Sequence, residues 1–204
     1  MPTHEAPPNI LQIYRDFILP GAEAAYREIE EDAARICAEH GCPHPHLALE
    51  SLTTPTEVWW LNAYDSDAQK DTVAEAYMSN RALMASLDQI APRKQDLVMP
   101  PEDIFVHYRP DLSRGSTWKI AGARFFVVTL TTGGTQVGGS NFEAADGRRF
   151  ILRRAETRGQ ADALLAADDR DTRIFAVRPY WGFPALEWIA ADAEFWGVNP
   201  AVMR

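Results

Sequence analysis

The chain has 204 residues, of which 46% are hydrophobic and 24% are charged. This composition is typical of a globular protein of one domain or two small ones, and it excludes disordered and fibrous classes. The formal net charge is −9, which disfavours nucleic acid as a partner because a negative surface repels phosphate.

The ends and the cysteines favour a cytoplasmic protein. Residues 1–8 lack the basic and apolar regions of a secretory signal, and no apolar run approaches the roughly 18–20 residues of a membrane span. We therefore expect no membrane partner. The two cysteines, Cys37 and Cys42, lie five positions apart and are expected to be free thiols.

The first half of the chain alternates strands and helices in the order β-α-β-β-α-β. The predicted elements are a strand at 9–19, a helix from 22 to Gly41, strands at 46–52 and 57–64 with a turn at 53–56, a helix from a capping box at Ser66 and Gln69 to residue 90, and a strand at 104–109. This is the order of a ferredoxin-like unit, in which two helices cover one face of an antiparallel sheet. The opposite face then needs another surface to pack against.

Residues 110–118 resemble a loop and mark a boundary. Residues 1–115 carry 9 basic and 19 acidic side chains, whereas residues 116–204 carry 11 and 10. The elements predicted after the boundary are a strand at 124–131, a flexible glycine-rich loop from Gly133-Gly134 through Gly138-Gly139 and a hairpin of Asn141–Ala144 and Arg148–Ala155 around Asp146-Gly147. They are followed by a helix from a capping box at Thr157 and Gln160, a strand at 173–180 and a helix at 185–195. This half looks like the first with its first helix lost and a C-terminal helix gained.

The first half resembles the dimeric α/β-barrel superfamily, in particular its antibiotic-biosynthesis-monooxygenase and NIPSNAP-like branches. The residues that carry the resemblance are the strand running into Pro20-Gly21, a helix bearing Tyr26, and the segment Val58–Ser66 that leads from a strand into a helix. The resemblance implies an α+β fold in which ferredoxin-like sheets form an α/β barrel, commonly as a homodimer. The superfamily contains cofactor-free oxygenases, haem enzymes and members of unknown role, and no catalytic motif of a specific member is present here.

We accordingly predict one complete unit at 1–115 and one truncated unit at 116–204, which together or between chains form a barrel. Because strand side chains alternate between faces, each strand separates an apolar set from an aromatic and polar set. We expect the two helices to cover the apolar set, which comprises Leu11, Ile13, Leu47, Leu49, Trp59, Leu61, Ala63, Ile104 and Val106. The uncovered face would then carry Gln12, Tyr14, His46, Glu50, Trp60, Asn62, Tyr64, His107 and Arg109.

Apolar walls with a few polar groups are typical of a small-molecule pocket. His107 is the candidate general base, Arg109 the candidate partner of a carboxylate or oxyanion, and Tyr14 a candidate hydrogen-bond donor. Gln12, His46, Glu50, Trp60, Asn62 and Tyr64 would bind the substrate. The same residues also suit a dimer interface, where Tyr, Trp and Arg are enriched.

These residues favour two functions. The first is a cofactor-free oxygenase or isomerase acting on a small aromatic or enolisable molecule, and the alternative is a non-catalytic ligand-binding or dimerisation protein. In a further alternative, His107 is an axial haem ligand. Zinc ligation is also open for the segment containing Cys37, His40, Cys42, His44 and His46, but its spacing matches no standard zinc framework, and we predict no metal site.

Overall fold

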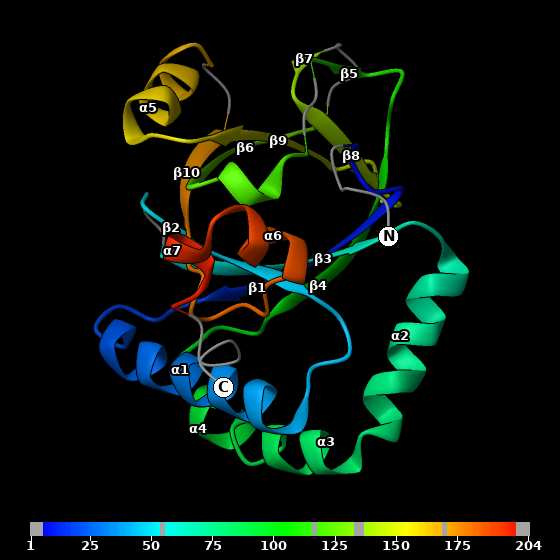
Figure 1. The fold of residues 1–204 in the computed structure, drawn as a ribbon. Helices are drawn as coiled ribbons and strands as arrows, with labels where there is room; N and C mark the ends of the chain where they lie inside the picture. Colours follow the sequence, from blue (N-terminus) through cyan, green and yellow to red (C-terminus); the bar gives the residue numbers. More distant parts are fainter. Residues whose placement is uncertain (1–5, 54–55, 116–117, 133–136, 169–170, 199–204) are drawn as a thin grey trace.

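The computed structural model describes residues 6–53, 56–115, 118–132, 137–168 and 171–198. Eight strands close into a barrel in the order β1-β3-β2-β10-β6-β9-β8-β4 (Figure 1). Their bounds are β1 Ile10–Phe17, β2 His46–Ser51, β3 Glu57–Tyr64, β4 Glu102–Tyr108, β6 Phe125–Thr131, β8 Ser140–Ala144, β9 Arg149–Ala155 and β10 Asp171–Val177. A separate short pair consists of β5 Ser113–Arg114 and β7 Val137–Gly138. Of the predicted loops and ends, residues 1–5, 54–55, 116–117 and 133–136 lie outside the described residues.

The barrel consists of two four-stranded sheets with the same internal order. The first is β4-β1-β3-β2, and the second is β8-β9-β6-β10. If β6, β8, β9 and β10 are counted as strands one to four, both sheets have the ferredoxin-like arrangement 4-1-3-2. Antiparallel pairing of β2 with β10 and of β4 with β8 joins the sheets. The α+β barrel expected from the sequence is therefore present, and it closes within one chain.

The two halves differ in how helices cover them (Figure 1). Four helices accompany the first sheet, namely α1 Glu23–His40, α2 Asp67–Ser79, α3 Arg81–Leu87 and α4 Ala91–Gln95. The single helix α5 Arg158–Ala166 packs on the outer side of the second sheet through Val127, Ala155 and Ile174. No helix of the described chain is long and apolar enough to cross a membrane.

The prediction of one helix up to residue 90 is wrong, because the first helix ends before Asn80 and a second begins after it. The Asn80 side chain accepts a hydrogen bond from the amide of Leu83 and thereby caps a new helix. The two pieces also differ in burial, since α2 buries none of its residues whereas α3 buries Leu83. A proline in the first turn then starts α4, where a missing amide proton costs nothing.

The C-terminal helix predicted at 185–195 is also divided, into α6 Leu186–Ala191 and α7 Ala193–Trp196. Asp192 separates them, and its side chain accepts from the amide of Phe195. Trp188 and Trp196 pack against each other and join the barrel core together with Ile120 of the short 3-10 helix η1 (Ile120–Gly122). These elements close one end of the barrel (Figure 1).

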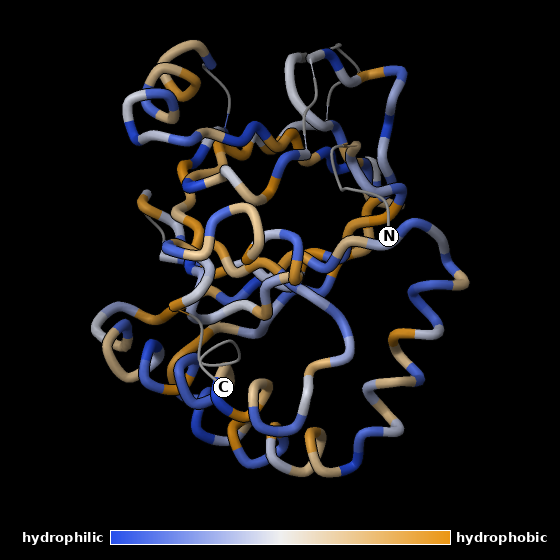
Figure 2. Tube along the Cα trace, in the orientation of Figure 1, coloured by the Kyte–Doolittle hydropathy of each residue, from blue (hydrophilic) through white to orange (hydrophobic). Residues whose placement is uncertain are grey.

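The strand alternation predicted from the sequence is present, but the two faces are exchanged. The apolar set fills the barrel interior rather than packing under the helices. Leu11, Ile13, Leu47, Leu49, Trp59, Leu61, Ile104 and Val106 belong to one buried cluster with Phe126, Val128, Phe142, Phe150, Leu152, Phe175 and Val177 of the second sheet. Figure 2 shows this apolar character concentrated in the barrel strands, whereas α1 to α4 are largely hydrophilic.

The exchange has a physical reason. A closed barrel removes its interior from water on every side, so the interior positions need apolar side chains from both sheets. The helices over the first sheet supply polar partners of their own, and the face beneath them can therefore remain polar. The aromatic and polar set consequently lies on the outside of the barrel, facing the helices.

The capping boxes offer a first testable result. The Thr157 hydroxyl accepts from the amide of Gln160, and the Gln160 side chain accepts from the amide of Thr157, as the sequence predicted. Replacing Thr157 with alanine should lower the free energy of unfolding by about 1 kcal/mol, because an amide at the start of α5 loses its acceptor. Urea denaturation measures the loss. Arg158→Ala is the control, since that exposed residue contributes only an ion pair at the surface, and an equal loss in both variants would contradict the prediction.

Candidate functional site

Strand register brings six of the predicted site residues together on the helix-facing side of the first sheet. Gln12 pairs with Asn62 and Tyr14 pairs with Trp60 across β1 and β3. His46 pairs with Asn62 across β2 and β3, and Tyr64 donates a hydrogen bond of 3.1 Å to the Gln12 side chain. Gln12, Tyr14, Trp60 and Asn62 are half-buried, so water reaches them although helices lie above the sheet.

A buried charged network adjoins this surface. The Lys94 ammonium from α4 pairs with Asp16 of β1 and lies 2.8 Å from the Glu30 carboxylate of α1. The Tyr26 hydroxyl donates to Asp16 at 2.8 Å. Both carboxylates are almost fully buried, whereas the Lys94 side chain is 18% exposed. Lys94 is therefore the member of the network that a ligand could reach.

Aromatic rings surround the Lys94 ammonium. Its nitrogen lies 4.4 Å from the ring centroid of Trp60, 5.1 Å from that of Tyr26 and 5.8 Å from that of Tyr14. Tyr14 and Trp60 contact each other edge to face, with ring centroids 5.8 Å apart. The faces of electron-rich rings attract a cation, so this arrangement holds the ammonium at the edge of the half-buried surface.

Two hydrogen-bond donors remain available there. An ammonium has three N–H donors, and Asp16 and Glu30 occupy two of those of Lys94. The Tyr14 hydroxyl has no hydrogen-bond partner among the described residues. A ligand oxygen placed beside Trp60 would therefore meet one donor from Lys94 and one from Tyr14.

Burial and charge fix the protonation states of these groups. Burial raises the pKa of Tyr14, and the neighbouring Asp16 carboxylate raises it further, so the hydroxyl keeps its proton at neutral pH. Burial opposes the charge of Lys94, but Glu30 and Asp16 outweigh that effect and raise its pKa. Burial also raises the pKa of Glu30, although Lys94 works against it. Glu30 therefore takes up a proton at a higher pH than an ordinary carboxylate does.

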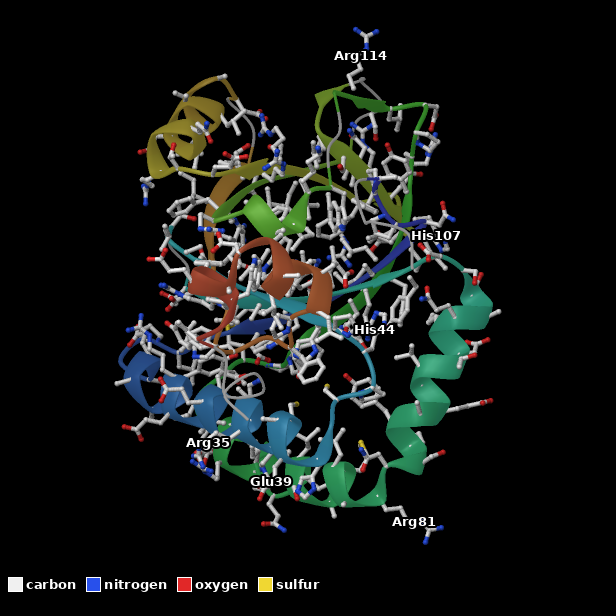
Figure 3. The ribbon with its side chains drawn as sticks, in the orientation of Figure 1. Arg35, Glu39, His44, Arg81, His107 and Arg114 are labelled. Carbon is white, nitrogen blue, oxygen red and sulfur yellow. The ribbon has the colours of Figure 1, made fainter. Side chains whose placement is uncertain are left out.

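The remaining predicted residues lie elsewhere or are engaged. His107 is exposed on β4 beside the start of α2 (Figure 3). Arg109 follows that strand, and its guanidinium binds Asp111 at 2.9 Å and also Glu143. Glu50 is buried and pairs with Arg27 and Arg178. The structure therefore does not bring the predicted base and the predicted anion-binding arginine to the surface that holds Tyr14 and Trp60.

The histidine and cysteine side chains of residues 37–46 do not all lie together. His40 hydrogen-bonds Ser86, and His44 contacts the Ala63 carbonyl while its ring stacks on Tyr64. Cys37 and Cys42 belong to one buried cluster. Over the part of the chain that the structure describes, no group of three His, Cys, Asp or Glu side chains is placed to hold a metal ion.

Lys94, Tyr26 and Glu30 are not among the site residues predicted from the sequence. Lys94 lies in α4, which was not predicted. Tyr26 enters only through the family resemblance, and no role is predicted for Glu30. The spacing of four residues between Tyr26 and Glu30 does put them on one side of a helix, and this is the signal that could have shown them together.

The barrel interior offers little room for a ligand. The cavity at its mouth, lined by residues that include His44, Trp118 and Trp188, has a volume of about 30 Å³. Small-molecule sites usually measure about 300–1,000 Å³. The barrel interior is therefore too small for such a ligand.

Comparison with known proteins supports the fold. No protein-family model matches the chain, and the search of curated proteins gives no match. A structure from Fusobacterium nucleatum subsp. nucleatum, named "Putative monooxygenase", is similar with a TM-score of 0.50 at 9% identity, covering 84% of this chain and 93% of that one. A "putative monooxygenase" from Lactobacillus acidophilus gives a TM-score of 0.46 at 8% identity, covering 82% and 93%. At these identities the first likeness shows the fold alone.

Proposed function

We propose that the chain binds a small aromatic or enolisable molecule on the helix-facing surface and stabilises its anion, as a cofactor-free oxygenase or isomerase does. The observation that carries this proposal is the Lys94 ammonium beside Tyr14 and Trp60 on a half-buried surface, with a donor to spare. The printed name of the Fusobacterium nucleatum protein agrees with oxygenase chemistry.

The arrangement suits a planar ligand with an acidic hydroxyl. Trp60 provides a face for stacking, while Lys94 and Tyr14 donate to the oxygen that becomes negative. Donors already held in place stabilise a developing oxyanion without reorganisation, and loss of one such donor commonly costs about 100- to 1,000-fold in rate. The same donors would lower the pKa of a bound phenol or enol.

The proton that leaves the ligand needs an acceptor. Glu30 is the proposed acceptor, because its raised pKa brings it closer to the pKa of an acidic hydroxyl. Its carboxylate contacts Lys94 rather than the open surface, so Lys94 would give one proton to Glu30 and, as the neutral amine, take the proton of the ligand. The resulting anion is either reprotonated at another carbon, which is isomerisation, or passes electrons to O₂.

A phenol whose anion is coloured tests the first step. 4-Nitrophenol absorbs visible light only as the phenolate, so its absorbance reports ionisation directly. We expect the protein to raise the phenolate fraction at a pH slightly below the pKa of the free phenol. Tyr14→Phe should reduce this effect about tenfold or more, because one of two donors is lost.

Tyr108→Phe is the matched control, since Tyr108 packs on Phe142 and belongs to the barrel cluster rather than to the cluster that contains Trp60. An unchanged phenolate fraction with wild-type protein, or equal losses in the two tyrosine variants, would contradict the proposed site. Oxygen uptake with a panel of enolisable aromatics then separates an oxygenase from the non-catalytic binding alternative. An oxygenase consumes O₂ in a Tyr14-dependent manner, whereas a binding protein does not.

A further inference from the structure

The end of helix α1 brings the two cysteines of the chain together. Gly41 adopts a φ of 76°, which turns the chain out of the helix. The amide of Cys42 then donates to the carbonyl of Cys37 at 3.1 Å. This closure over six residues places the first and sixth side chains against each other. Both are free thiols, and they share one apolar cluster with Leu83 of α3.

Polar groups from two other elements reach the same place. The Tyr77 hydroxyl of α2 lies 2.9 Å from the Cys42 sulfur. The His46 imidazole, at the start of β2, and the Cys37 thiol both lower the pKa of Cys42 from nearby. Cys42 therefore has a second thiol, an imidazole and a phenol around it, and the proposed binding site uses none of these groups.

We propose that Cys37 and Cys42 form a redox-active dithiol, which hydroperoxides oxidise to an intramolecular disulfide with Cys42 as the attacking sulfur. Cys42 is the attacking member because the Tyr77 hydroxyl lies against its sulfur and because it lies in a loop between the exposed residues Gly41 and Pro43. Cys37 lies within the last turn of the helix and is the resolving thiol.

The oxidation has two balanced steps. The Cys42 thiolate attacks one oxygen of the hydroperoxide, so an S–O bond forms, the O–O bond breaks and hydroxide or alkoxide leaves with a proton. Cys37 then attacks the Cys42 sulfenic acid, so the S–S bond forms, the S–O bond breaks and water leaves with the Cys37 proton. Two thiols and hydrogen peroxide thereby give one disulfide and two molecules of water.

The surroundings of the two sulfurs also shift their pKa values in opposite directions. The hydrogen bond from the Cys37 thiol lowers the pKa of Cys42, and His46 and Tyr77 lower it further against the effect of burial. The same thiol–thiol hydrogen bond, with burial, raises the pKa of Cys37. A thiolate is the reactive form, and an ordinary thiol is only a few per cent ionised near neutral pH.

Mass spectrometry of the whole folded chain tests the proposal. Native protein treated with a small excess of hydrogen peroxide should lose two hydrogen atoms and both alkylatable thiols, and a thiol reductant should restore them. Cys37→Ser should stop at the sulfenic acid, which dimedone captures on Cys42. Cys42→Ser should react at least about tenfold more slowly, because its remaining thiol stays protonated.

A folding control accompanies each variant, because both cysteines are buried. Tyr77→Phe keeps the ring and removes only the hydroxyl at 2.9 Å, and it should slow oxidation while leaving the circular dichroism spectrum unchanged. Three results would overturn the inference. In the first, the wild-type disulfide forms only in denaturant. In the second, dimedone captures Cys37 in the Cys42→Ser variant as fast as it captures Cys42 in the Cys37→Ser variant. In the third, oxidation joins two chains rather than closing one loop.

Discussion

Replacing Lys94 with methionine should lower the free energy of unfolding at neutral pH by about 3–5 kcal/mol, although this residue is in a helix of only five residues. The substitution keeps most of the side-chain volume and removes the charge. Asp16 and Glu30 would then remain buried beside each other without a cation. Removing one partner of a buried ion pair typically costs about 3–5 kcal/mol, because the remaining charge is left buried without compensation.

The loss should depend on pH in a defined direction. The pKa of Glu30 is raised in the folded state above its ordinary value of 4.5, so the folded chain binds more protons than the unfolded chain above that pH. Stability attributable to this group therefore falls as pH rises from 4.5 through the folded-state pKa. Without Lys94 the cost of burying the charged Glu30 carboxylate is larger. The difference in unfolding free energy between variant and wild type should therefore shrink as the pH is lowered toward 4.5.

Urea unfolding across this pH range measures the effect. Arg93→Ala is the matched control, because its ion pair with Asp32 is at the surface, where such pairs contribute about 0–1 kcal/mol. A Lys94→Met variant as stable as Arg93→Ala at every pH would show that the network contributes nothing. It would also remove the electrostatic basis of the proposed anion site.

Truncation of two adjacent tryptophans should lower the free energy of unfolding by very different amounts. Trp59→Ala should cost about 3–5 kcal/mol of unfolding free energy, which is the usual loss for a large aromatic core residue. Trp59 is fully buried in the barrel, its ring centroid lies 4.7 Å from that of Phe175, and its indole N–H donates to Glu57 at 2.8 Å. Truncation leaves a cavity and removes this hydrogen bond.

Trp60→Ala should cost only about 1 kcal/mol, because the side chain is half-buried and its loss opens no closed cavity. It should nevertheless abolish the absorbance change of 4-nitrophenol, since the stacking face is gone. Denaturation and phenolate absorbance, measured on both variants, check the pair. Equal destabilisation, or retained phenolate binding by Trp60→Ala, would contradict the assignment of the two faces.

Much of the chain's local structure follows from the sequence. The strand–helix–strand order, the stop at Gly41, the hairpin at Gly147 and the capping box at Thr157 appear as expected. At Ser66 only half of the predicted box forms, because the Gln69 side chain accepts from the amide of Asp65. These features depend on neighbouring residues, through alternation, turn geometry and side-chain hydrogen bonds to the backbone. The alternation of faces also follows from the sequence alone, because it is a property of every strand. It placed Tyr14, Trp60 and Asn62 on one surface.

Only the tertiary structure decided which face lies inside. The sequence shows two faces, but barrel closure by pairing of β2 with β10 and β4 with β8 involves residues more than 30 positions apart. Once closed, the interior excludes water from both sheets and requires the apolar face, so the polar face turns toward the helices. Lys94 contacts Asp16 and Glu30 because α4, β1 and α1 pack together in the folded chain. No local sequence pattern predicts such a contact.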